Sequence, residues 1–182
     1  MNSSEIKDAP DFLPAGQLFC FGLGFSSQAL AKRLLPQGWD VSGTVRGEQE
    51  NSRAKNISVC SFDGSRPTTE ISEAISHATH LLITIPPQPS GDVVLENFAE
   101  EISRARQLQW IGYISSTGVY GDTQGEWVDE SSPLLASTDR NRQRIEVESA
   151  WLKIGKDHGL PVMIFRCVGI YGPGRNLLVS VR

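Results

Sequence analysis

The sequence contains little cysteine, histidine or methionine, with three, three and two residues among 182. Cys20, Cys60 and Cys167 are an odd number, widely spaced, and each lies inside an apolar run. They therefore predict buried strand residues and argue against a disulfide framework or a metal site. The histidines show neither metal-ligand spacing nor a neighbouring nucleophile, so we expect structural or surface roles for them. No metal centre is expected.

Long apolar runs and an excess of positive charge are also absent. No apolar run approaches the roughly 18 residues that a membrane span requires. Residues 1–16 have neither a basic region followed by an apolar one nor an arginine-rich amphipathic pattern, so they predict a loose surface segment and no export signal. The net charge of -4 gives no general attraction to nucleic acid or to an anionic membrane. We expect a cytoplasmic protein with a small-molecule partner, and we leave a homodimer open.

What the sequence does contain is an alternating pattern. Short runs rich in Val, Ile, Leu and Phe alternate with segments of helical period, which is typical of strands joined by crossover helices in a parallel sheet. We expect an α/β fold, a Rossmann doubly wound parallel sheet of about six strands in three αβα layers, forming one domain over residues 17–176. The predicted strands are 17–21, 40–45, 57–62, 80–85, 110–115 and 161–168, and the last predicted helix covers about 139–157.

A glycine-rich turn, GLGFSS at 22–27, follows the first predicted strand and opens a helix. It is a G-x-G-x-x-S version of the dinucleotide fingerprint. Gly22 permits the tight turn, and Gly24 lets the backbone approach a pyrophosphate, to which the helix N-terminus offers free N–H groups. Ser27 replaces the third glycine, where a small residue still allows helix and strand to pack closely. We predict a dinucleotide site that includes Phe25 and Ser26, and a tight turn without a ligand is the alternative.

The second predicted strand ends in Arg46, about 20 residues after the glycines. An acid there would hold the ribose 2′-hydroxyl of NAD, whereas an arginine suits the 2′-phosphate of NADP. Arg53 and Lys55 could add positive charge, although a solvated loop would also explain them. We therefore predict NADP as the cofactor and rank NAD second. Asp63 is placed to meet the adenine, but a turn-forming Asp-Gly is an equally good account. Pro86, which stops the fourth strand, completes the predicted cofactor site.

Four motifs, taken in order, resemble the NAD-dependent epimerase/dehydratase family, the extended short-chain dehydrogenases/reductases. They are the glycine turn, ISSTGVYGD at 114–122, WVDESSP at 127–133 and RCVGIYGPGRN at 166–176. The resemblance implies hydride transfer between a nicotinamide and a hydroxy, keto or nucleotide-sugar-like substrate. It also implies that Ser116 polarises the substrate oxygen, and we place Thr117 beside it as a substrate contact.

The family's Tyr-x-x-x-Lys pair is missing at the place that the resemblance gives it. Aligning on Ile145 and Glu148 puts Arg140 at the tyrosine position and Arg144 at the lysine position. Arginine stays protonated at any working pH, so it cannot replace the tyrosine in proton transfer. Arg144 could still bind the nicotinamide ribose, and Arg140 could hold an anionic substrate or a cofactor phosphate. The alternative for both is a solvated helix face with salt bridges to residues such as Glu146 and Glu148.

These departures leave two functions open. The first is an atypical NAD(P)-dependent oxidoreductase or epimerase, with Tyr120 as a substitute proton donor and with Tyr113 and Tyr171 as further candidates; a packing role is the alternative for all three. The second is a sensor or regulatory module that binds NADP(H) without turnover. Longer members of the family carry a C-terminal lobe that closes over the substrate, so we expect residues 177–182 to be a truncated end with that lobe missing.

Overall fold

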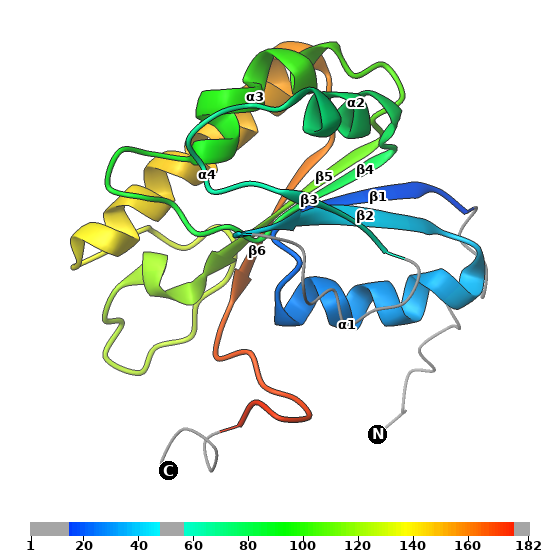
Figure 1. The fold of residues 1–182 in the computed structure, drawn as a ribbon. Helices are drawn as coiled ribbons and strands as arrows, with labels where there is room; N and C mark the ends of the chain where they lie inside the picture. The colour runs from blue at the N-terminus through cyan, green and yellow to red at the C-terminus, as the bar shows by residue number, and fades with distance from the viewer. Residues whose placement is uncertain (1–14, 48–56, 177–182) are drawn as a thin grey trace, which may run out of the picture.

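The computed structural model describes residues 15–47 and 57–176, which form one six-stranded parallel sheet flanked by helices (Figure 1). The strands are β1 Gln17–Phe21, β2 Asp40–Val45, β3 Ser58–Ser61, β4 His80–Ile83, β5 Trp110–Ser116 and β6 Val162–Cys167. The α-helices are α1 Phe25–Leu34, α2 Thr69–His77, α3 Val93–Arg104 and α4 Asp139–His158, with short 3-10 helices η1 Leu35–Gln37 and η2 Thr117–Tyr120.

The strand order is β3-β2-β1-β4-β5-β6, and every neighbouring pair is parallel. This is the doubly wound order, in which the direction of winding reverses between β1 and β4. Ligands of such sheets bind at the carboxyl ends of the strands beside that reversal. The predicted fold class is therefore confirmed, although β3 and β4 are shorter than predicted and α2 was not predicted.

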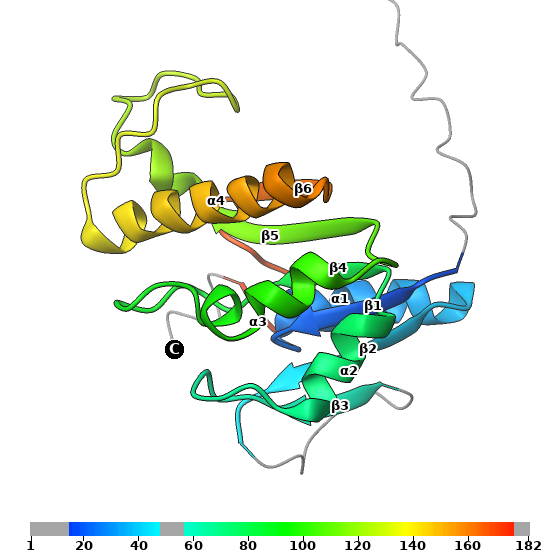
Figure 2. The ribbon, with the colours of Figure 1, turned by 90° about the horizontal axis from the view of Figure 1, so that it is seen from above.

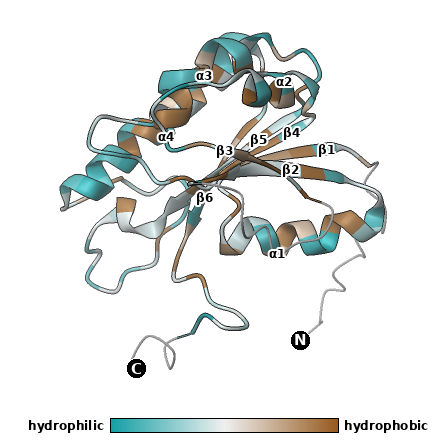
Figure 3. Cartoon of the chain, viewed as in Figure 1, coloured by the Kyte–Doolittle hydropathy of each residue, from teal (hydrophilic) through white to brown (hydrophobic). Residues whose placement is uncertain are grey.

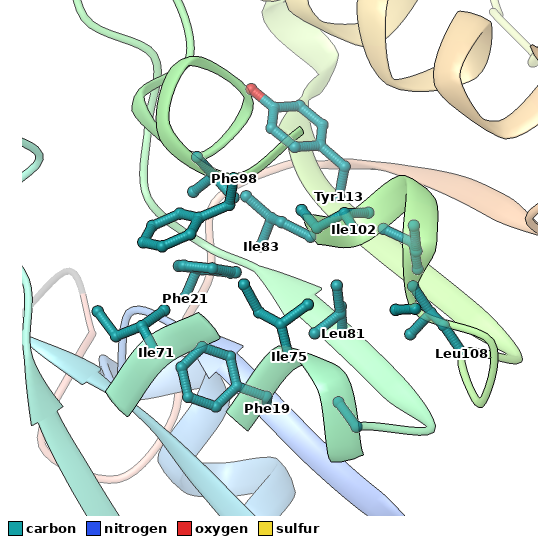
Figure 4. Packing of buried hydrophobic residues seen from close by; sticks show 14 of the residues in the cluster. Phe19, Phe21, Ile71, Ile75, Leu81, Ile83, Phe98, Ile102, Leu108 and Tyr113 are labelled. Carbon is teal, nitrogen blue, oxygen red and sulfur yellow. The ribbon is translucent and has the colours of Figure 1, made fainter. Parts of the chain in front are cut away.

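Helices α2, α3 and α4 cover one face of the sheet, and α1 covers part of the other (Figures 1 and 2). The alternation of side chains along a strand explains both layers. In β1, Phe19 and Phe21 belong to the cluster beneath α2 and α3, while Leu18 and Cys20 belong to the cluster against α1. Figure 4 shows the first cluster, and Figure 3 shows apolar residues along β1 and β2 and helices that carry both apolar and polar residues.

The cysteines and histidines lie mostly where the sequence predicts. Cys20 and Cys60 are buried, whereas Cys167 is only half-buried because it ends the edge strand β6, so that part of the prediction is wrong. His80 packs between Trp39 and Trp110, with ring centroids 4.8 and 6.0 Å away, and this burial lowers its pKa. In the described part of the chain, no three metal-ligating side chains gather into a site.

The two predicted ends, 1–16 and 177–182, lie almost wholly outside the described residues. None of the helices in the described ranges has the length and apolar character of a transmembrane segment.

Candidate functional site

The glycine turn after β1 is held by hydrogen bonds from β2, from α1 and from the residue that follows β4. The N–H of Gly22 donates to Thr44 Oγ1 of β2 at 2.9 Å. The carbonyl of Gly22 accepts from Ser27 Oγ at 2.7 Å and from Thr84 Oγ1 at 2.8 Å. Gly22 has φ +97°, and a Cβ there would lie 2.6 Å from Thr84 Oγ1, so only glycine fits. Ser27 is buried, as expected of a small residue that replaces the third glycine where helix and strand pack closely.

Gly24 has a different reason to be glycine. Its backbone is extended, which any residue adopts, and a Cβ there would meet no atom within 4 Å. Gly24 is also the N-cap of α1, which has no side-chain cap and no acidic residue in its first turn. The missing side chain therefore leaves open space in front of free N–H groups at the positive end of a helix, which suits an anion.

Two pockets meet at Gly24 and extend along the carboxyl ends of the strands. We call the first, of about 330 Å³ beside β2, the β2 pocket, and the second, of about 700 Å³ beside β5, the β5 pocket. They share Gly24, Thr84 and Pro86, so together they form one cleft across the point where the strand order reverses.

Most of the predicted site residues line this cleft. Those in the β2 pocket are Gly22, Gly24, Arg46 and Pro86. Those in the β5 pocket are Gly24, Phe25, Ser26, Pro86, Ser116, Thr117, Arg140 and Arg144. The predicted cofactor and substrate residues, which are up to about 120 positions apart, thus meet in one place because parallel strands end at the same edge of the sheet.

Of the predicted cofactor residues, Ser27 is buried under the glycine turn and does not line the cleft, and neither does Asp63. Its Oδ1 accepts from the backbone N–H of Ser65 at 2.9 Å and from the Ser65 hydroxyl at 2.6 Å, and these bonds lower its pKa. This is the turn that the sequence offered as the alternative to an adenine contact. Arg53 and Lys55 lie outside the described residues.

The three arginines at the start of α4 have separate roles. Arg142 pairs with Asp139 at 2.6 Å and donates to the carbonyls of Ala136 and Ser137. Arg144 is only 9% exposed, and its Nη1 donates to the Ile114 carbonyl at 3.5 Å. Arg140, one helical turn earlier, is exposed at the rim of the β5 pocket.

Neither Arg140 nor Arg144 forms an ion pair with any carboxylate in the described ranges. The alternative interpretation, a solvated face bridged to Glu148, is therefore wrong for Arg144, which is buried while Glu148 binds Arg166. Two unpaired guanidiniums beside the free N-terminus of α1 make the β5 pocket suitable for anions.

Glu148, Arg166, Ser115 and Tyr120 form a buried network that sequence reasoning missed. Arg166 donates to the Glu148 carboxylate at 2.8 to 3.3 Å, and Ser115 Oγ donates to it at 2.5 Å. The Tyr120 hydroxyl accepts from Arg166 Nη1 at 2.9 Å, and the guanidinium lies 5.1 Å from the Tyr120 ring centroid. The signal for this network was a lone arginine in the apolar β6 run and a glutamate on the apolar face of α4.

The tyrosines do not enter the β5 pocket. Tyr120 is 6% exposed and lines a separate pocket with Arg166 and Val128, where its role as proton donor stays a prediction. Tyr113 is fully buried, and burial, reinforced by Asp92, raises the pKa of its phenol. Figure 4 shows the Tyr113 hydroxyl pointing away from Phe21 and Leu81. Tyr171 is 81% exposed on the loop after β6.

Arg175 is a further residue of the β5 pocket that the sequence motif contained but that was not predicted for the site. Its guanidinium lies 5.4 Å from the ring centroid of Phe25, the first residue of α1. A third cation therefore reaches the cleft from the segment after β6.

The strand order and the glycine turn define a Rossmann fold, and its cleft at the carboxyl edge of the sheet is lined by cations. The chain is 33% identical over 175 residues to Protein YeeZ of Escherichia coli strain K12, a match that covers 85% of this chain and 59% of that protein. The chain thus spans less than two thirds of the length of the curated relatives that it matches. No protein-family profile matches it.

Solved structures show the same fold over most of the chain. A functionally unknown conserved protein from Silicibacter pomeroyi DSS is 38% identical with a TM-score of 0.80, over 92% of this chain and 57% of that one. A protein provisionally assigned as an NAD-dependent epimerase/dehydratase from Methylobacillus flagellatus is 28% identical with a TM-score of 0.72, over 89% and 57%. UDP-glucuronic acid 4-epimerase from Bacillus cereus, solved in complex with NAD, is 18% identical with a TM-score of 0.71, over 88% and 58%. The predicted resemblance to the NAD-dependent epimerase/dehydratase family is confirmed.

Proposed function

We propose that this chain binds a nicotinamide dinucleotide along the cleft and acts as an atypical oxidoreductase of the epimerase/dehydratase type. The observation that carries the proposal is Gly24, whose absent side chain opens the cleft in front of the uncapped N-terminus of α1. A Cβ would project into that open space, where the free N–H groups of α1 would bind a pyrophosphate, so the residues present fit this group. The epimerase from Bacillus cereus was solved with NAD, which supports the same class of cofactor here.

Each part of the cleft would hold a different part of the cofactor. The β2 pocket, with Arg46 at its edge, would hold the adenosine, and Arg144 would donate to the nicotinamide ribose. The nicotinamide supplies the hydride acceptor or donor when it is bound. Ser116 ends β5 beside Arg144, where its hydroxyl would donate to the substrate oxygen and polarise the carbon that reacts.

The substrate that suits the β5 pocket is a negatively charged hydroxy or keto compound, such as a nucleotide sugar. Arg140 stands unpaired at the rim in the described structure, one helical turn from Arg144, and would bind the anionic group while Thr117 contacts the reacting end. The arginines cannot exchange protons, so the proton that accompanies hydride transfer would have to come from another group, for which Tyr120 is the candidate.

NADP is the cofactor that we propose over NAD. Arg46 is exposed at the end of β2, and no acidic side chain lines the β2 pocket among the residues described. A fluorescence titration with NADPH and NADH tests this preference, which Arg46→Ala should reduce. Tighter binding of NADH by the unaltered protein would overturn it.

The proposal as a whole is tested with Gly24→Ser. Serine is a favoured N-cap, so this change should keep or raise the free energy of unfolding while its side chain occupies the cleft and weakens NADPH binding about tenfold. The matched variant Gly22→Ala should instead lower stability, because its Cβ would clash with Thr84 and its φ is positive. If Gly24→Ser binds NADPH as tightly as the unaltered protein, the cofactor does not lie where we propose.

A non-catalytic sensor of NADP(H) is the second candidate, favoured by the arginines at positions 140 and 144. NADPH oxidation across a panel of hydroxy and keto compounds, repeated with Ser116→Ala, separates the two functions. Turnover that Ser116→Ala abolishes supports the enzyme, whereas tight binding without any turnover supports the sensor.

A further inference from the structure

The segment after β6 is docked on the start of α1. Gly172 and Arg175 exchange two backbone hydrogen bonds of 2.8 and 2.9 Å, which close a tight turn. A Cβ at Gly172 would lie 2.9 Å from Phe25 Cζ, so this turn rests directly against the Phe25 ring. Figure 1 shows the segment running from β6 along the side of the sheet that carries α1.

This docking fixes where the Arg175 guanidinium lies. It is over the Phe25 ring, 5.4 Å from its centroid, and Phe25 directly follows Gly24 at the N-terminus of α1. Arg175 lines the β5 pocket together with Gly24, Phe25 and Ser26, and it has no ion pair with a carboxylate within the described ranges. A guanidinium without a carboxylate partner in the described chain therefore lines the same pocket as the free N–H groups at the start of α1.

We propose that Arg175 is a cofactor-binding residue that clamps the pyrophosphate of the dinucleotide against the N-terminus of α1. The inference rests on the proposed cofactor site and names a contact in it that the glycine turn alone does not provide. A guanidinium binds phosphate oxygens through two parallel N–H donors, and stacking on Phe25 orients it before the ligand arrives, so little side-chain freedom is lost on binding.

Arg175 could bind either the pyrophosphate of the cofactor or a phosphate of the substrate, because both offer the same oxygen acceptors. The position of Arg175 favours the pyrophosphate. Arg175 contacts the first residue of α1, where the pyrophosphate of a Rossmann ligand lies. Arg140 lies instead on α4, which packs on β5 where the reacting end of the substrate is expected.

The test uses ligands that differ in the pyrophosphate. NADPH and ADP-ribose contain it and adenosine lacks it, so calorimetry or ligand-observed NMR gives three dissociation constants for each variant. Arg175→Ala should weaken NADPH and ADP-ribose about tenfold and leave adenosine unchanged, as expected for the loss of one charge-assisted contact. Phe25→Leu, which keeps the charge and removes the stacked ring, should weaken the same two ligands about two- to fivefold.

Arg142→Ala is the matched control because it removes an arginine that is paired with Asp139. It should leave all three constants unchanged. Three results would each overturn the clamp. Arg175→Ala could bind ADP-ribose as tightly as the unaltered protein, or it could bind adenosine as weakly, relative to the unaltered protein, as it binds ADP-ribose. The third result is that Arg142→Ala weakens ADP-ribose binding as much as Arg175→Ala does. Failure of the unaltered protein to bind any of the three ligands would instead refute the proposed function. Circular dichroism of each variant checks that the fold is intact.

Discussion

Arg144 and Arg166 lie on neighbouring elements, α4 and β6, but only one of them is neutralised. Arg166 has an exposed side-chain fraction of 17% and gives three hydrogen bonds to the Glu148 carboxylate. Arg144 is 9% exposed and has one long bond to a carbonyl, with no carboxylate partner in the described chain. Removing a charge from water costs several kcal/mol unless it is paired. Arg166 therefore stabilises the fold, whereas we propose that Arg144 is left free to donate to the bound dinucleotide.

The largest effect is expected from removing the partner of Arg166. Glu148→Ala should lower the free energy of unfolding by at most about 3 to 5 kcal/mol, because Glu148 is buried and its loss leaves the half-buried Arg166 guanidinium without a counter-charge. Urea denaturation measures this loss. Glu146→Ala is the matched control, since Glu146 is exposed on the same helix, and it should change stability by no more than about 0.5 kcal/mol. Equal effects of the two changes would contradict the structural role of the pair.

Arg144 should behave in the opposite way. Arg144→Met keeps the apolar length of the side chain but removes its charge, so the unfolding free energy should stay the same or rise. The dissociation constant for NADPH should rise about tenfold, which corresponds to about 1.4 kcal/mol. Arg142→Met serves as the control for fluorescence titrations and should bind NADPH normally. A loss of stability like that of Glu148→Ala, with normal NADPH binding, would place Arg144 with Arg166 as a structural residue.

The fold could be predicted from the sequence because its signals are local. Each strand is a short apolar run, and the runs at 17–21 and 40–45 match β1 and β2 residue for residue. Helix α2 was missed because its short sequence TEISEAISH buries only Ile71 and Ile75, a pattern too brief to stand out. The order of strands in space followed from topology rules, not from any single segment.

The site was only half predictable for a related reason. The glycine turn is contiguous, so its chemistry can be inferred from one stretch, and Ser116 follows from a family motif. The network of Glu148 with Arg166, and the stacking of Arg175 on Phe25, join residues 18 and 150 positions apart along the chain. No spacing rule connects such pairs. Which arginine is neutralised therefore emerged only from the three-dimensional contacts.

The smallest effect concerns Asp92, which with Glu148 is one of the two buried carboxylates in the described part of the chain and which forms no ion pair there. Asp92 caps α3 by accepting from the N–H groups of Val94 and Leu95, and it accepts from Trp151 Nε1 at 3.3 Å. Burial raises its pKa, whereas an arginine partner would lower it. The folded state therefore takes up a proton at higher pH than the unfolded chain, so protonation of Asp92 favours folding.

Stability measured against pH tests this assignment. As pH falls from neutral through the raised pKa of Asp92 to about pH 4, the unaltered protein should gain stability relative to Asp92→Asn, which keeps an oxygen for the helix cap and cannot titrate. Urea denaturation of both proteins at several pH values gives the difference directly. If the unaltered protein instead loses stability relative to Asp92→Asn as pH falls, the pKa of Asp92 is lowered in the fold, either by its N–H donors or by a cation. Only a cation would weaken the contrast between Arg144 and Arg166, because Arg144 would then be a paired arginine as well.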